Sequence, residues 1–138
     1  MTQQQDPTST SPASQQGLTI MVWSCDPQNP ERAATPFMAA QAAAAMDLKV
    51  EMLFTAQAVQ WLLPEHADTL IGFGPQSLPV RHYLEVAAGL GIEMRACSQA
   101  MHALGLGREG LVPQCAGLGG LVAFLGRGQE VGWRMLVF

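Results

Sequence analysis

Short apolar segments with the length and composition of β-strands alternate with helical segments along most of this chain. We predict strands over residues 18–24, 49–54, 92–96 and 132–138. We predict helices over residues 33–46, 56–63, 80–88, 98–104 and 116–125. Strands that alternate with helices over short connections pair in parallel through right-handed crossovers. The pattern therefore predicts an α/β fold, a flavodoxin-like or Rossmann-like three-layer sandwich with a mainly parallel sheet.

Two segments fall outside this alternation. Residues 1–16 are rich in Gln, Thr, Ser and Pro, and they lack the basic start and apolar block of a secretory signal, so we expect a disordered N-terminal tail. Residues 65–79 contain several glycines and prolines and are predicted to form a surface loop near the site or at a subunit contact. The remaining length, residues 17–138, suits a single α/β domain.

The charge content limits the classes of partner. Only 13% of the residues are charged and 49% are hydrophobic, which is a low charge content for a monomer, so we expect a homo-oligomer. Seven Lys and Arg residues are scattered through a chain of net charge −4, which argues against a nucleic-acid partner. No apolar run has the length of a spanning helix, so we expect a cytoplasmic protein with no membrane partner.

Cys97 holds the position where chemistry is most expected in such a fold. It follows the predicted strand 92–96 directly and precedes the predicted helix 98–104. Functional groups of parallel sheets gather beyond the carboxyl ends of the strands. The unpaired N–H groups at the start of a helix favour a thiolate, and Arg95 and His102 are nearby sources of positive charge. A small core residue is an equally good interpretation of this position, because free cysteines are often buried.

The other two cysteines are weaker candidates. Cys25 follows the predicted strand 18–24 and is a candidate resolving thiol or second sulfur acceptor at the same sheet edge. Cys115 lies at the predicted start of helix 116–125, where the helix dipole would act on it, and a buried packing role is the alternative. Three cysteines without paired spacing, in a chain expected inside the cell, do not indicate a disulfide framework.

Metal and phosphate motifs do not fit this sequence. It contains no CxxC or HxxxH pair, so we expect no metal ion, and we interpret His66 and His82 as surface residues. Glycines at 105–107 and 117–120 superficially suggest phosphate loops. The first group follows a predicted helix, the second lies within one, and the lysine of a nucleotide-binding loop is absent. We therefore expect no cofactor.

Several short motifs accompany Cys97. They are Ala96-Cys97, Met101, Leu104-Gly105-Leu106, Glu109-Gly110-Leu111, Ala116-Gly117-Leu118 and Phe124, with Phe54-Thr55 upstream. The motifs from Ala96 onward resemble the C-terminal half of the DsrE/DsrF-like family of sulfur-trafficking proteins, and Phe54-Thr55 is similar to that family's aromatic-Thr corner. The resemblance extends roughly over residues 18–138.

The resemblance implies a flavodoxin-like fold, a homotrimer or related oligomer, and a sulfurtransferase-like carrier with persulfide sulfur on Cys97. Its expected partners are a TusA-type sulfur carrier and a rhodanese-type donor, in sulfur oxidation or tRNA thiolation. Cys115 departs from the pattern, since an aliphatic residue is usual there, and Cys25 is not a family feature, so the number of working thiols stays open. Two other functions also remain: a small-molecule or nucleotide-binding module, and a thiol-based redox protein in which Cys25 resolves an oxidised Cys97.

Overall fold

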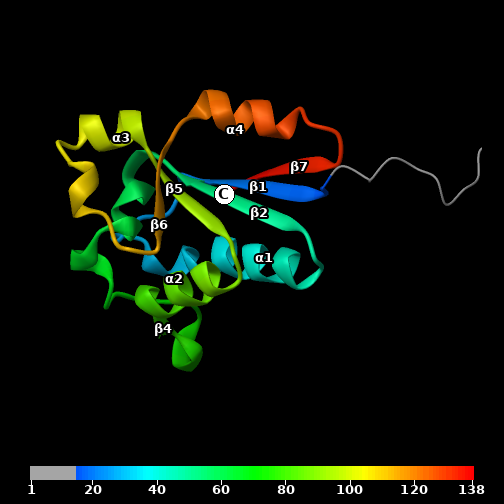
Figure 1. Ribbon diagram of the computed structural model, residues 1–138. Coiled ribbons are helices and arrows are strands. Elements are labelled where there is room, and N and C mark those ends of the chain that lie inside the picture. Colours follow the sequence, from blue (N-terminus) through cyan, green and yellow to red (C-terminus); the bar gives the residue numbers. More distant parts are fainter. Residues whose placement is uncertain (1–14) are drawn as a thin grey trace, which may run out of the picture.

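A five-stranded parallel sheet forms the centre of the computed structural model, which describes residues 15–138 (Figure 1). Its strands are β1 (Gly17–Val22), β2 (Lys49–Phe54), β5 (Glu93–Cys97), β6 (Cys115–Gly119) and β7 (Trp133–Val137). The strand order is β6-β5-β2-β1-β7, and all four neighbouring pairs are parallel. The predicted α/β sandwich with a mainly parallel sheet is therefore confirmed.

Helices cover both faces of the sheet. Helices α1 (Ala34–Ala45) and α2 (Val80–Gly89) lie on one face, and α4 (Leu121–Gly128) lies on the other (Figure 1). Helix α3 (Ser98–Ala103) continues directly from β5. The connections contain the 3₁₀ helices η1 (Pro30–Arg32), η2 (Ala56–Leu62), η3 (Pro64–His66), η4 (Gly74–Gln76) and η5 (Arg108–Gly110).

The two faces of the sheet differ in polarity. Ile20, Met52 and Met94 are paired neighbours on β1, β2 and β5, on the face beneath α1 and α2, and each is at most 1% exposed. Because successive side chains of a strand point to opposite faces, the residues directly before and after them face α4. Those positions include Glu51 and Arg95. The main core therefore lies under α1 and α2, and charged side chains lie under α4.

The prediction of a helix over residues 116–125 is wrong in its first half. Residues 115–119 form the edge strand β6, which pairs with β5, and the helix begins only at Leu121. Glycine is a poor helix former, and Gly117 has a φ of 130°, which a residue with a side chain rarely adopts. The glycines at 117–120 are thus a strand and its connection to α4, and not part of a helix as predicted.

Other differences are smaller. The predicted helix 56–63 is the 3₁₀ helix η2, and the predicted loop 65–79 contains a short antiparallel pair, β3 (Leu70–Ile71) with β4 (Leu78–Pro79). The tail predicted over residues 1–16 lies, except for its last two residues, outside the described part of the chain.

Candidate functional site

Cys97 is the last residue of β5 and immediately precedes α3. Its φ of −64° and ψ of 121° keep the backbone extended up to the helix. The side chain is 2% exposed and belongs to the hydrophobic core. The predicted position at the carboxyl end of a strand is therefore confirmed, and the thiol is covered in this conformation.

The end of β2 lies beside the end of β5. Phe54 of β2 pairs with Ala96, so Thr55 follows at the level of Cys97. The next residue, Ala56, has a φ of 51°, a left-handed conformation that is unusual for a residue with a side chain. Helix η2, which starts at Ala56, packs against β5 and α3. This turn therefore helps to cover the edge of the sheet where Cys97 lies.

Cys25 lies three residues beyond β1 at the same edge of the sheet. It is 2% exposed, and its carbonyl oxygen accepts a hydrogen bond of 3.2 Å from Nε1 of the buried Trp61. Burial raises the pKa of the Cys25 thiol, which favours its protonated form. β2 separates β1 from β5 in the sheet. Cys25 and Cys97 thus share an edge of the sheet but follow strands that are not neighbours.

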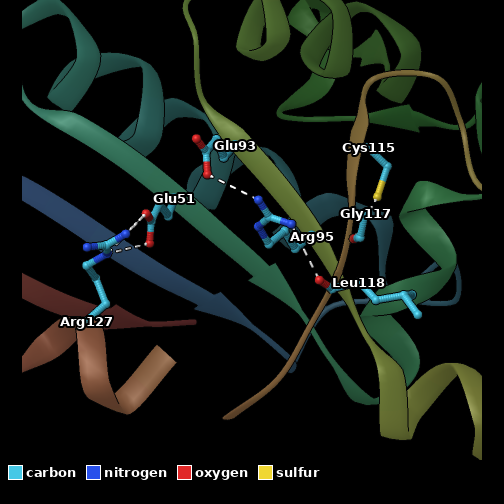
Figure 2. A network of polar contacts seen from close by, with 7 residues as sticks. All are labelled: Glu51, Glu93, Arg95, Cys115, Gly117, Leu118 and Arg127. Atoms are coloured by element: carbon cyan, nitrogen blue, oxygen red, sulfur yellow. Dashed lines mark hydrogen bonds and ion pairs between the residues drawn. The ribbon is translucent and has the colours of Figure 1, made fainter. Parts of the chain in front are cut away.

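Cys115 lies at the opposite end of the sheet. It is the first residue of β6 and pairs with Met94, whereas Cys97 pairs with Gly119. Its Sγ donates a 3.4 Å hydrogen bond to the carbonyl oxygen of Gly117 (Figure 2). The prediction that Cys115 starts a helix is wrong, because the edge of β5 recruits this segment as a strand. No helix dipole therefore acts on its thiol.

The three histidines lie on separate elements, α3, α2 and η3. His102 is exposed near the end of α3, His82 is exposed on α2 with its ring edge-on to Tyr83 at 5.6 Å, and His66 lies in η3. Within residues 15–138, His, Cys, Asp and Glu side chains form no group of three or more with the spacing of a metal site. None of the helices described there is long and apolar enough to cross a membrane.

A cleft of about 280 Å³ lies between α4 and the sheet, which the sequence did not lead us to expect. Apolar side chains such as Leu53 and Phe124 line part of it, together with five charged residues. The charged residues are Glu51, Glu93, Arg95, Arg127 and Glu130. The sequence signal for this cleft is the presence of charged residues at alternate positions of otherwise apolar strands. Such residues mark a sheet face that is not packed as core.

Arg127 of α4 is fully engaged in this cleft. Its Nε lies 3.0 and 3.1 Å from the two carboxylate oxygens of Glu51, and its Nη2 donates to Glu51 at 2.7 Å (Figure 2). Its Nη1 donates to Glu130 at 2.6 Å, and the guanidinium lies 4.5 Å from the ring centre of Trp133. The hydrogen bonds to Glu51 and Glu130 raise the pKa of Arg127. This arginine therefore ties α4 to β2.

The chain is similar to a known protein family and to solved structures. The model of the DsrE/DsrF-like family matches residues 18–138. The crystal structure of the ychN protein from E. coli is similar with a TM-score of 0.69 and 16% identity, over 89% of this chain and 99% of that chain. MTH1491 from Methanobacterium thermoautotrophicum, described as a protein of unknown function, is similar with a TM-score of 0.67, the same identity and the same coverage. No curated protein matches the chain. At this identity the two structures show the fold alone.

Proposed function

The chain belongs to the DsrE/DsrF-like family, and from that premise we propose that it is a sulfur carrier that holds sulfane sulfur as a persulfide on Cys97. The position of Cys97 carries the proposal. It ends β5 at the carboxyl edge of a parallel sheet, where functional groups of this architecture gather. Burial raises the pKa of Cys25, the other thiol at this edge, which disfavours its thiolate form.

The proposed reaction is thiol exchange at sulfur. The Cys97 thiolate attacks the outer sulfur of a donor persulfide, RS–SH, so that a new S–S bond forms on Cys97 as the donor S–S bond breaks. The donor leaves as the thiolate RS⁻, the transferred sulfur keeps its proton, and no oxidant is consumed. An acceptor thiolate later removes the outer sulfur by the same step. The low exposure of Cys97 supports this role, because a buried persulfide is shielded from oxidants.

The proposal includes protein partners. A rhodanese-type donor and a TusA-type acceptor, in a sulfur-oxidation or tRNA-thiolation relay, suit the family premise, with the reaction taking place in the cytoplasm where thiols stay reduced. Assembly as a trimer or related homo-oligomer is supported by large apolar side chains on the outer surface of α4, where Val122 is 89% and Leu125 is 53% exposed.

Intact-mass spectrometry tests the proposal. Reduced protein is incubated with inorganic polysulfide, freed of excess reagent and weighed beside Cys97→Ser, Cys25→Ala and Cys115→Ser. We expect adducts of about 32 Da per sulfur atom that collapse on reduction and that only Cys97→Ser loses. Circular dichroism of each variant controls for folding. Unchanged loading of Cys97→Ser, or no loading of the wild-type protein, would contradict the proposal.

A further inference from the structure

Arg95 lies in the cleft on the same strand as Cys97. The two residues are separated by one position of β5, so their side chains are directed to the same face of the sheet, about 7 Å apart along the strand. Gly119, which also lines the cleft, pairs with Cys97. The cleft therefore approaches the edge of the sheet where Cys97 lies.

The neighbouring strand leaves room for the guanidinium of Arg95. A β-carbon built on Gly117 would lie 3.6 Å from Nη1 of Arg95, and one built on Gly119 would lie 3.2 Å from its Cβ. Both positions of β6 lack side chains, so the arginine lies across the edge strand without being covered by it (Figure 2). The side chain is 42% exposed.

The hydrogen bonds of Arg95 are longer than those of Arg127. Its Nη2 lies 3.5 Å from Glu93, and its Nη1 donates to the carbonyl oxygen of Leu118 at 3.5 Å, both at the outer limit of a hydrogen bond. A guanidinium has five N–H donors arranged to bind a carboxylate with two of them. Within residues 15–138, these two long contacts are the polar contacts of the Arg95 side chain. Arg95 thus retains donors for a ligand.

The charges around Arg95 favour a ligand that carries both a negative and a positive group. The cleft contains three carboxylates and two guanidinium groups, and Arg127 is already paired with two of those carboxylates. The remaining pair is Arg95 with Glu93, which is 40% exposed. A purely anionic ligand at Arg95 would be repelled by Glu93, whereas an α-amino acid would place its carboxylate on Arg95 and its ammonium group on Glu93.

We propose that this cleft binds a small persulfide carrying an α-amino-acid group, of the cysteine persulfide class, and presents its outer sulfur to Cys97. This substrate assignment rests on the proposed function. In cysteine persulfide the outer sulfur is only a few bonds from the carboxylate, and Cys97 lies two residues beyond Arg95 on the same strand. Because Cys97 is 2% exposed, the transfer also requires the side chains that cover its thiol to move aside. The transfer is the exchange given above, with cysteine thiolate as the leaving group. Arg95 and Glu93 are substrate-binding residues, and Leu53 and Phe124 form the apolar wall.

The test measures how fast Cys97 gains sulfur from two donors, by intact mass under excess donor. One donor is L-cysteine persulfide, and the other is the persulfide of N-acetylcysteamine, which has the same reactive group but no carboxylate or ammonium. We expect Arg95→Gln to slow loading from cysteine persulfide about 10-fold, the effect of losing charged hydrogen bonds, and to leave the second donor unchanged. Arg95→Lys should restore part of the rate, because it restores the charge.

Two further variants sharpen the result. Arg81→Gln is the matched control, because Arg81 is a half-exposed arginine paired with Asp68 outside the cleft, and it should change neither rate. Glu93→Gln should remove the preference for L-cysteine persulfide over the persulfide of 3-mercaptopropionate, which lacks the ammonium group. Equal slowing of both donors by Arg95→Gln, or equal rates in Arg95→Gln and wild type, would overturn the assignment. If neither donor loads sulfur onto Cys97, the result contradicts the proposed function itself.

Discussion

Cys97 of β5 pairs with Gly119 of β6, so the sheet position beside the thiol carries no side chain. A β-carbon at position 119 would lie 3.2 Å from Cβ of Arg95 and 3.3 Å from Cδ1 of Leu53. Those contacts are tighter than ordinary van der Waals packing, and the Arg95 Cβ is fixed by its backbone. The space between β5, β6 and α4 therefore depends on this glycine.

We expect Gly119→Val to lower the free energy of unfolding by about 1 to 3 kcal/mol, because extra methyl groups must displace β5 side chains. Urea denaturation measures the effect. Gly110→Ala is the control, since no atom lies within 4 Å of a β-carbon built there, and its change should be small. A destabilisation by Gly119→Val no larger than that of the control would show that the close approach is unimportant.

We expect replacement of Ala56 by glycine to stabilise the folded protein. The φ of 51° at Ala56 costs a residue with a side chain roughly 1 kcal/mol, and glycine adopts the same conformation without that cost. Since glycine also gains entropy in the unfolded chain, we expect Ala56→Gly to raise the unfolding free energy by no more than about 1 kcal/mol. Ala42→Gly, at an exposed position of α1, should lower it by about 1 kcal/mol. Thermal denaturation compares the two, and a loss of stability in Ala56→Gly would contradict the argument.

The ion pair between Glu51 and Arg127 should contribute more to stability than an exposed pair. Glu51 is 19% and Arg127 33% exposed, and the carboxylate accepts from two nitrogens of the guanidinium. We expect Glu51→Gln to cost about 1 to 2 kcal/mol in urea denaturation. Asp68→Asn, which breaks the pair with Arg81 at 81% and 52% exposure, should cost less than about 0.5 kcal/mol. Equal effects of the two variants would argue against a role for burial.

The buried thiol of Cys25 predicts a dependence of stability on alkaline pH. Burial raises the pKa of Cys25 in the folded protein. Below about pH 8.5 the thiol is protonated in both the folded and the unfolded protein, so its ionisation does not affect the free energy of unfolding. Above that pH the unfolded chain releases the proton while the folded protein retains it, so stability falls as pH rises. We expect the stability advantage of wild type over Cys25→Ala to shrink between pH 8 and pH 10. A constant difference across that range would show that Cys25 ionises equally in both states.

Some of these features were accessible from the sequence because they are local. The boundary at Cys97 was predicted correctly, since a run of strand-forming residues meets a helical pattern there. Cys115 was misplaced because the segment Cys-Ala-Gly-Leu-Gly has no alternation, and its strand conformation comes from pairing with β5. The cleft was missed because it depends on which charged strand residues α4 covers. Those residues lie far from α4 in the sequence, so no local pattern reports their contact.

The places of Cys97 and Cys115 in the sheet decide whether these two thiols can form a disulfide. Cys97 pairs with Gly119 and Cys115 pairs with Met94, so the two cysteines differ by three positions along β5, about 10 Å. A disulfide requires α-carbons within about 7 Å, and the sheet pairing holds both strands in register. We therefore expect mild oxidation of the native protein to leave Cys97 and Cys115 unlinked, and Cys115→Ser to load sulfur at the wild-type rate. Peptide mapping after alkylation detects the link, and finding it in native protein would mean that β6 detaches from β5 during the reaction.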